Sequence, residues 1–262
     1  MATRKEIQTT LKAQNAQRDT KIASFRNRLQ RFMATNLDEI LGDLESGDLS
    51  ALEAANVLGG LRQALVDAGL DEEVGGLLDI YRDELNGIEE LFNLTTGRDL
   101  TYSDIDADVI DALINFDIER TRGEVLQYAE EIKSVVMRSV LTGNAPNICD
   151  LHDELGDSTF NNIETELRTS VTGFSQSLNN AKALEAGLEL FLYIGPDDDA
   201  TREFCADVLE SRTPPIYTAE EIADMDNGQG LEVATYMGGY NCRHRWSALS
   251  LDVAKSLGYG EN

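Results

Sequence analysis

The chain has 262 residues, of which 42% are hydrophobic, and its formal net charge is −26. This apolar content is too high for a disordered chain and is enough for one large core or two modest ones. No apolar run approaches the roughly 18 residues that a membrane-spanning helix needs, and the first residues lack the apolar stretch of a signal peptide, so we expect a soluble protein without a membrane span.

The charge is distributed unevenly along the chain. Residues 1–34 contain eight Lys or Arg and two acidic residues, a net charge of +6, which leaves −32 for the rest. A surface that acidic repels nucleic acids, so any contact with DNA has to come from the basic residues between positions 4 and 31 or from a local basic patch.

The first half of the chain contains no proline and has apolar residues at helical spacing, which predicts helices throughout. On the first helix an apolar stripe is formed by Ile22, Phe25, Leu29 and Phe32. We expect this stripe to pack on a partner protein while the basic face stays solvated. The alternative is that the basic face, which carries Arg4, Lys5, Lys12, Arg18, Lys21, Arg26, Arg28 and Arg31, lies on DNA.

Several further helices are predicted along the chain. Asn36 and Glu39 have the spacing of a capping box and predict the start of a second, short helix. Apolar spacing then predicts helices over 52–66, 74–92 and 103–140. A short helix around 149–155 should precede a longer one over 163–178.

The pattern changes after Gly187. Residues 187–194 are apolar, partly alternating and bounded by glycines, as expected of a strand, and Leu231 to Tyr236 suggest a second strand. Residues 199–211 read as a helix, and Thr218 with Glu221 forms a capping box that opens another. The predicted fold is mainly α (α+β). An elongated helical region, residues 1–103, contacts a partner, and residues 104–262 form a second domain that ends in a small α+β subdomain.

All three cysteines and both histidines lie between residues 149 and 244. The main metal candidates are Cys205, Cys242 and His244, because zinc prefers thiolate and imidazole ligands, and Cys149 with His152 on one helix face is held in reserve. A disulfide or close thiol contact between Cys205 and Cys242 is an alternative, and ordinary packing of all five residues is another. If these residues bind zinc, or if the two thiols form a disulfide or a close contact, Cys205 and Cys242 should lie close together, with His244 beside them.

The segment Arg243-His244-Arg245-Trp246 has the composition of a patch that holds phosphate and base, which makes a nuclease one alternative. An acid–base nuclease needs a second converging group, and none lies in a recognisable motif. We find no nucleophile–base pair, phosphate loop or cofactor fingerprint, and therefore predict no enzyme and no cofactor apart from the zinc candidate.

Three segments resemble the head-morphogenesis domain of tailed-phage minor head proteins, the family of the Mu-type F protein. They are Ile163-Glu164-Thr165-Glu166, the Asp-rich turn Asp197 to Thr201 with Arg202-Glu203-Phe204-Cys205, and Tyr240-Asn241-Cys242-Arg243-His244. The resemblance covers about residues 105–250. It departs from the family pattern where Cys205 replaces a histidine and His244 replaces the last cysteine.

The resemblance implies a structural bacteriophage virion protein that is made in the host cytoplasm and located in the head near the portal. It further implies few copies, partners among the portal or other head proteins, an oligomer within the virion, and a role in head assembly, DNA packaging or DNA ejection. Two alternatives remain: a nuclease or toxin-like enzyme that uses the Arg243-His244-Arg245 patch, and a neck or tail adaptor.

Overall fold

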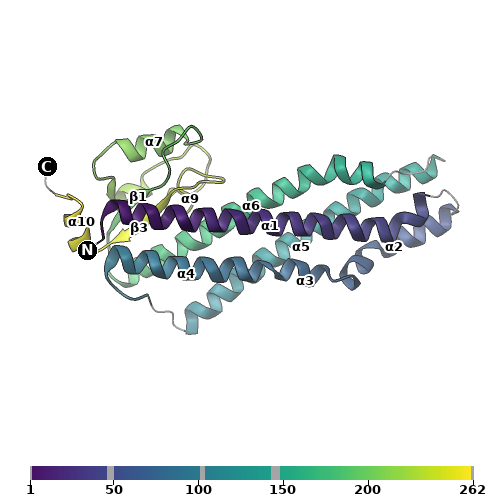
Figure 1. The fold of residues 1–262 in the computed structure, drawn as a ribbon, viewed down its shortest axis with the longest axis horizontal. Coiled ribbons are helices and arrows are strands. Elements are labelled where there is room, and N and C mark those ends of the chain that lie inside the picture. Colours follow the sequence, from purple (N-terminus) through teal and green to yellow (C-terminus); the bar gives the residue numbers. More distant parts are fainter. Residues whose placement is uncertain (1, 46–49, 101–103, 143–147, 261–262) are drawn as a thin grey trace. The chain divides into compact units, whose positions relative to one another are not determined.

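The computed structural model describes residues 2–45, 50–100, 104–142 and 148–260. It confirms a mainly α fold with a small antiparallel sheet near the C-terminus (Figure 1). Within the described residues, no helix is both long enough and apolar enough to cross a membrane. The elements in chain order are α1 (Arg4–Glu45), α2 (Ala51–Asp67), α3 (Leu70–Gly75), α4 (Leu77–Thr96), α5 (Asp104–Leu141), α6 (Ile148–Glu185), β1 (Leu190–Ile194), α7 (Glu203–Glu210), β2 (Ile216–Thr218), α8 (Ala219–Ala223), α9 (Val233–Tyr236), β3 (Arg245–Leu249) and α10 (Leu251–Ser256).

The chain forms two compact units. The sheet unit contains residues 1–21, 79–111 and 165–262, and the helical unit contains residues 22–78 and 112–164. Each unit therefore draws on both sides of the division at residue 103 that the sequence suggested. The reason is that α1, α4, α5 and α6 each contribute residues to both units.

Helix α1 is continuous, whereas the sequence predicted a second helix beginning near Asn36. The buried residues of α1 recur every three or four positions up to Leu44, so the same face stays buried across the predicted boundary. The side-chain amide of Asn36 donates to the backbone carbonyl of Phe32, one turn earlier in the same helix, at 2.8 Å. The capping-box spacing at Asn36 is therefore not used as a cap.

The apolar stripe of α1 belongs to the core of the helical unit. Ile22, Phe25 and Leu29 are at most 2% exposed, and Phe32 is half-buried. Ile22, Phe25 and Leu29 pack within this chain, which corrects the prediction that they bind a partner protein, whereas for the half-buried Phe32 a partner contact stays a prediction. The same unit buries residues from other helices, among them Leu58, Leu61, Leu65, Leu70, Val74, Val125, Tyr128, Ala129, Ile132, Val136, Phe160 and Ile163.

The sheet has the strand order β2-β1-β3, with both outer strands antiparallel to β1. Because successive side chains of a strand point to opposite faces, β1 contributes to two clusters. Phe191 and Tyr193 join a cluster on one face that includes Trp246. On the opposite face, the cluster containing Leu192 also includes Ile7 from α1. Both faces are covered, which explains the nearly continuous apolar run that predicted this strand.

The other elements near the C-terminus correct the sequence prediction in part. Residues 233–236 form the short helix α9, so the predicted strand over Leu231–Tyr236 is wrong. The two strands that pair with β1 instead are β2 and β3. The capping box of Thr218 and Glu221 is confirmed at the start of α8. The two helices predicted over 149–178 are one helix, α6.

An amide side chain covers the outer edge of β3. Gln176 of α6 accepts a hydrogen bond from the backbone N–H of Trp246 at 3.1 Å and donates to the carbonyl of the same residue at 2.9 Å. Asn179, one turn later, donates to that carbonyl at 3.0 Å. Gln176 therefore makes the two bonds that a neighbouring strand would make, and α6 fixes the position of β3.

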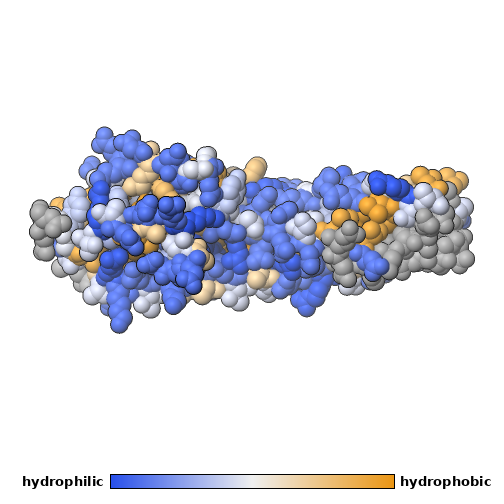
Figure 2. Space-filling model, turned by 90° about the horizontal axis from the view of Figure 1, so that it is seen from above, coloured by the Kyte–Doolittle hydropathy of each residue, from blue (hydrophilic) through white to orange (hydrophobic). Residues whose placement is uncertain are grey.

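The face of the molecule in Figure 2 is mainly hydrophilic, as expected from the net charge of −26. Large apolar side chains are nevertheless exposed at several described positions. They are Leu52, Leu78, Val109, Leu113, Phe116, Leu141, Leu184, Tyr240 and Leu251.

Candidate functional site

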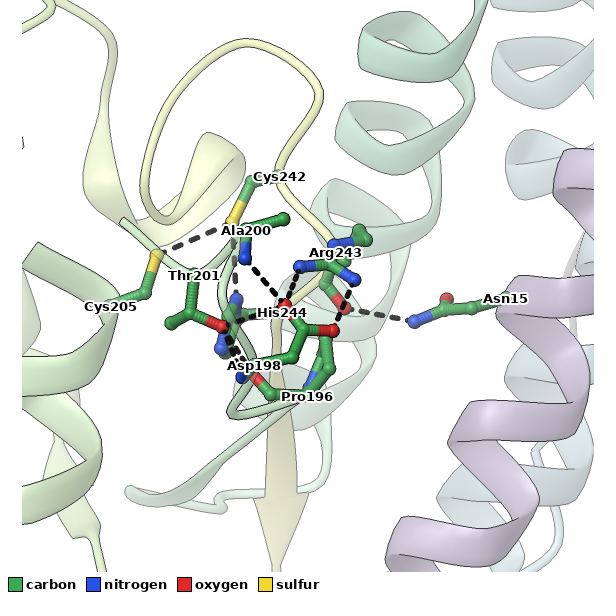
Figure 3. A network of polar contacts seen from close by, with 9 residues as sticks. All are labelled: Asn15, Pro196, Asp198, Ala200, Thr201, Cys205, Cys242, Arg243 and His244. Atoms are coloured by element: carbon green, nitrogen blue, oxygen red, sulfur yellow. Dashed lines mark hydrogen bonds and ion pairs between the residues drawn. The ribbon is translucent and has the colours of Figure 1, made fainter. Parts of the chain in front are cut away.

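Two segments of the sheet unit that are distant in sequence meet at one junction (Figure 3). One is the Asp-rich turn that leads into α7, and the other is the loop between α9 and β3. The contacts between them involve Asp198, Arg202 and Cys205 on the first segment and Cys242 and Arg243 on the second.

An ion pair joins the two segments. The guanidinium of Arg243 donates to both carboxylate oxygens of Asp198, at 2.8 and 2.5 Å. The Asp198 carboxylate also accepts from the backbone N–H of Ala200, and Thr201 closes the turn by accepting from the Asp198 N–H. The hydrogen bond from Arg243 is the main reason why the pKa of Asp198 is lowered to about 2. The carboxylate is thus ionised and held in one geometry.

Three further side chains fix the loop between α9 and β3. Arg202 donates to the carbonyls of Gly238 and Tyr240, at 3.1 and 2.6 Å. Asn241 adopts a left-handed conformation with φ of 57°, and its backbone N–H donates to the hydroxyl of Thr169 on α6 at 3.2 Å. On the other side, Asn15 of α1 donates to the carbonyl of Arg243 at 2.8 Å. Side chains from three other elements thereby hold the loop.

The prediction that Cys205 and Cys242 lie close together, with His244 beside them, is confirmed. The two sulfur atoms are 3.8 Å apart, and Cys242 Sγ lies 3.7 Å from His244 Nδ1. The three side chains are at most 5% exposed. Thiol and imidazole groups at this spacing can bind a soft or borderline metal ion, and the two thiols are also the natural partners for a disulfide.

The two thiols are not equivalent. A hydrogen bond from Cys205 lowers the pKa of Cys242 to about 4; burial opposes this shift and His244 assists it. The same hydrogen bond, together with burial, raises the pKa of Cys205 well above its usual range. The Cys242 thiol therefore loses its proton easily. The Cys205 thiol keeps its proton unless a positive charge takes its place.

Three residues that sequence reasoning did not single out shape this pocket. The ring of Tyr193 stacks on His244 with centroids 5.2 Å apart and planes 8° from parallel. Its hydroxyl is buried, and burial together with Cys242 and Cys205 raises its pKa far above the ordinary value, so it stays protonated. Glycine is needed at 195 and 238, because a Cβ there would lie 2.2 Å from His244 Cδ2 and 2.3 Å from Cys205 Sγ, respectively.

Arg245, the residue after His244, belongs to a buried cluster of charged side chains. The Arg245 guanidinium pairs with Glu84 of α4 and donates to Ser175 of α6 at 3.0 Å. Arg18 of α1 donates to Thr172 at 2.9 Å and is 5% exposed. Burial alone would raise the pKa of Glu84, but Arg245 and Arg18 outweigh it and hold that pKa below its ordinary value. Arg18 is therefore a core residue, not part of a solvated basic face.

Other basic residues of α1 are paired with acidic residues of this chain. Lys21 contacts Asp83 in the sheet unit. In the helical unit, Arg28 contacts Glu73 at 2.7 Å and Arg26 lies 3.6 Å from Asp157. Four of the eight basic residues that the sequence offered to DNA, Arg18, Lys21, Arg26 and Arg28, therefore are buried or have an acidic neighbour within the fold.

The remaining residues of the metal prediction are Cys149 and His152. Cys149 and His152 belong to α6 at positions within the helical unit, and their side chains lie outside the described residues. Among the side chains that the structure describes, Cys205, Cys242 and His244 are the only group of three or more metal-ligating residues this close together.

A cleft of about 530 Å³ opens beside the Asp198–Arg243 pair. Its walls come from α1, including Lys12, Asn15 and Asp19, and from the Asp-rich turn, including Pro196 and Asp197. Both signs of charge line it, so its composition singles out no ligand class.

With this geometry in hand, comparison of the chain with protein-family models, with curated proteins and with solved structures yields no significant match.

Proposed function

We propose that the chain is a structural component of a tailed-bacteriophage virion, a minor head or portal-associated protein that acts in head assembly, DNA packaging or DNA ejection. One observation carries this proposal. The segments with the family's motifs are distant in sequence, yet they contact one another in the fold: Asp198 binds Arg243, Cys205 lies against Cys242, and Asn241 contacts α6 near Thr165.

The motif residues interact with one another, although Asp198 and Arg243 also line the cleft beside α1. Asp198 and Arg243 neutralise each other, Arg202 holds two loop carbonyls, and His244 is 2% exposed under the ring of Tyr193. These residues hold the loop before β3 against the turn that leads into α7. Contacts of this kind stabilise the fold, which supports a structural role.

The partners we propose are the portal or other head proteins, within an oligomer in the virion, after synthesis in the host cytoplasm. Contact with DNA through residues 4–31 has less support, because Arg18 is buried and Lys21, Arg26 and Arg28 have acidic neighbours. Fluorescence anisotropy of the purified chain with duplex DNA should therefore show weak binding at physiological salt. Tight binding that falls steeply with salt would instead make the genome the partner.

The test is incorporation into particles. A phage that carries a nonsense mutation in this gene is complemented with wild-type protein or with a variant, and purified heads are analysed by mass spectrometry. We expect the wild-type chain in heads at fewer copies than the major capsid protein. Arg243→Ala should lose incorporation, whereas Arg82→Ala, at an exposed arginine of the same unit, should retain it.

Absence of the wild-type chain from both mature particles and assembly intermediates would contradict the proposal. Cryo-electron microscopy of the particle separates a head location from the neck or tail adaptor, which is the closest alternative. Portal and terminase genes beside this gene would support either one.

The nuclease alternative has little support from the patch that suggested it. Arg243 and Arg245 are paired with Asp198 and Glu84, and His244 is buried. Incubation of the purified chain with labelled RNA and DNA tests it directly. Cleavage by the wild type that His244→Ala abolishes would reverse the order of the two proposals.

A further inference from the structure

Cys205, Cys242 and His244 form a buried group whose three ligand atoms all lie within 4.8 Å of one another. Cys205 is on α7, Cys242 is in the loop before β3, and His244 directly precedes that strand. The group is therefore assembled by tertiary structure and not by a local sequence motif.

Two of the three separations between ligand atoms fit a tetrahedral metal ion, whereas the third, between Cys205 Sγ and the His244 ring nitrogen, extends to 4.8 Å and has to shorten when an ion binds. With zinc–sulfur bonds of about 2.3 Å and zinc–nitrogen bonds of about 2.0–2.1 Å, two sulfur ligands lie about 3.8 Å apart and a sulfur and a nitrogen ligand about 3.6 Å apart. The observed Sγ–Sγ separation is 3.8 Å, and the Cys242 Sγ–His244 Nδ1 separation is 3.7 Å. A disulfide needs about 2.0 Å between the sulfur atoms.

The surroundings hold the ligand atoms in place. The backbone N–H of Gly238 donates to Cys242 Sγ at 3.3 Å, as expected for a sulfur that carries negative charge. A side chain at position 238 would occupy the space beside Cys205 Sγ, and one at position 195 would collide with the His244 ring. Tyr193 stacks on that ring and sets its orientation. The pocket therefore has the built second layer that metal ligands need.

We propose that Cys205, Cys242 and His244 bind one zinc ion through the two sulfur atoms and His244 Nδ1. Cys242 already carries a negative charge, so the proton that leaves to solvent when the ion binds is that of Cys205, and the two positive charges of zinc are balanced by two thiolates. The ion ties α7 to the loop before β3 and stabilises the junction. This inference does not depend on the phage assignment, because it rests on the geometry of three side chains.

The first experiment uses the full-length wild-type chain, purified under reducing conditions with zinc present and then passed over a desalting column. Elemental analysis should give about one zinc per chain. Replacement with cobalt(II) should give the sulfur-to-metal charge-transfer bands and the intense visible bands of a tetrahedral thiolate site. A wild-type chain that retains no zinc and shows neither set of bands overturns the proposal without reference to any variant.

The variants then assign the ligands. Cys205→Ser and Cys242→Ser should each lose the bound zinc, whereas Cys149→Ser, the matched control at the third cysteine, should retain it. Tyr193→Phe removes the hydroxyl beside the two sulfur atoms and should keep the site but weaken zinc affinity roughly 10- to 100-fold. Unchanged affinity in Tyr193→Phe would show that the Tyr193 hydroxyl does not support the ligands. An intact mass two hydrogens below the sequence mass, after purification without reductant in the presence of zinc, would show a disulfide in place of the metal site.

Discussion

At the residue scale, Asp198 is the carboxylate on which the junction depends. It is exposed on one side, yet its pKa is lowered to about 2 because Arg243 donates two hydrogen bonds to it. A depressed pKa in the folded state means that the ionised form stabilises the fold above the unfolded pKa, near 4, and that this contribution disappears as the pH falls towards 2.

We expect Asp198→Asn to lower the thermal unfolding temperature at neutral pH. The difference from wild type should shrink as the pH falls below about 4, because the wild-type carboxylate then becomes protonated. Thermal unfolding followed by circular dichroism across this range measures it. Asp199→Asn, one position along the same exposed turn, is the control. If Asp199→Asn lowers the unfolding temperature equally and with the same pH dependence, the negative charge of the Asp-rich turn stabilises the fold and the Asp198–Arg243 pair does not.

Gly195 shows how closely backbone and imidazole approach. A Cβ at this position would lie 2.2 Å from Cδ2 and 2.9 Å from Cα of His244, and the backbone atom cannot move aside. Gly195→Ala should therefore cost about 1–3 kcal/mol of unfolding free energy, as overpacking typically does.

Gly123→Ala is the opposite case and serves as the control for Gly195→Ala. Gly123 lies inside α5 with nothing within 4 Å of its added Cβ, so alanine should stabilise the chain by up to about 1 kcal/mol. Urea unfolding of the two variants should move the midpoint in opposite directions. A urea midpoint of Gly195→Ala above that of wild type would mean that the pocket has room for a methyl group beside His244.

At the scale of elements, the stripe of α1 was recognised from the sequence, but its partner was not. Periodicity shows which face is apolar; it does not show whether the same chain or another protein covers it. Polar residues at buried positions were a usable signal, because Asn15 and Arg18 continue the spacing from Leu11 to Ile22 and point to a polar contact inside the fold. Reading Arg18 as part of a solvated basic face ignored that spacing.

Phe25 and Phe116 separate a core position from a surface position on the helical unit. Phe25 is 2% exposed and Phe116 is 66% exposed. Phe25→Ala should cost about 3–5 kcal/mol of unfolding free energy, and Phe116→Ala should change it by no more than about 0.5 kcal/mol. Chemical unfolding of both variants measures this. Similar losses in the two would mean that the Phe116 side chain is covered in solution.

The β-strands show what local sequence leaves undetermined. β1 was predicted because it is apolar on both faces and bounded by glycine, whereas β3 contains Arg245 and Ser247 and lacks a clear alternation. β3 is a strand because it pairs with β1 along its whole length and because Gln176 covers its other edge. Val233 to Tyr236 have strand propensity but no strand to pair with, and they form α9 instead.

We therefore expect Gln176→Leu to cost about 1–3 kcal/mol of unfolding free energy, since it leaves the buried N–H of Trp246 without its partner and removes one bond to its carbonyl. Gln127→Leu on the exposed face of α5 is the matched control and should be nearly neutral. Urea unfolding gives both values. A Gln176→Leu variant as stable as wild type would mean that water or Asn179 replaces both bonds.

At the scale of the whole molecule, apolar periodicity predicted the fold class, and the rarity of cysteine and histidine predicted part of the site. The three cysteines and two histidines are so few that their clustering near the C-terminus directed attention to Cys205, Cys242 and His244, and the fold brings these three together. Tyr193 could not be found in this way, since its place beside them depends on the pairing of β1 with β3. A strand position becomes part of a site only when the register of the sheet is known.

The amide of Gln176 has a consequence for solubility at high concentration. An open strand edge invites strand addition by another copy, which leads to aggregation. Here one edge of the sheet is closed by a side chain of α6, and the other edge strand, β2, is only three residues long, with its Ile216 carbonyl bonded by Arg212. Strand addition by another copy is therefore blocked at Trp246 on one edge and limited to three residues on the other, which favours ordered assembly through side-chain surfaces.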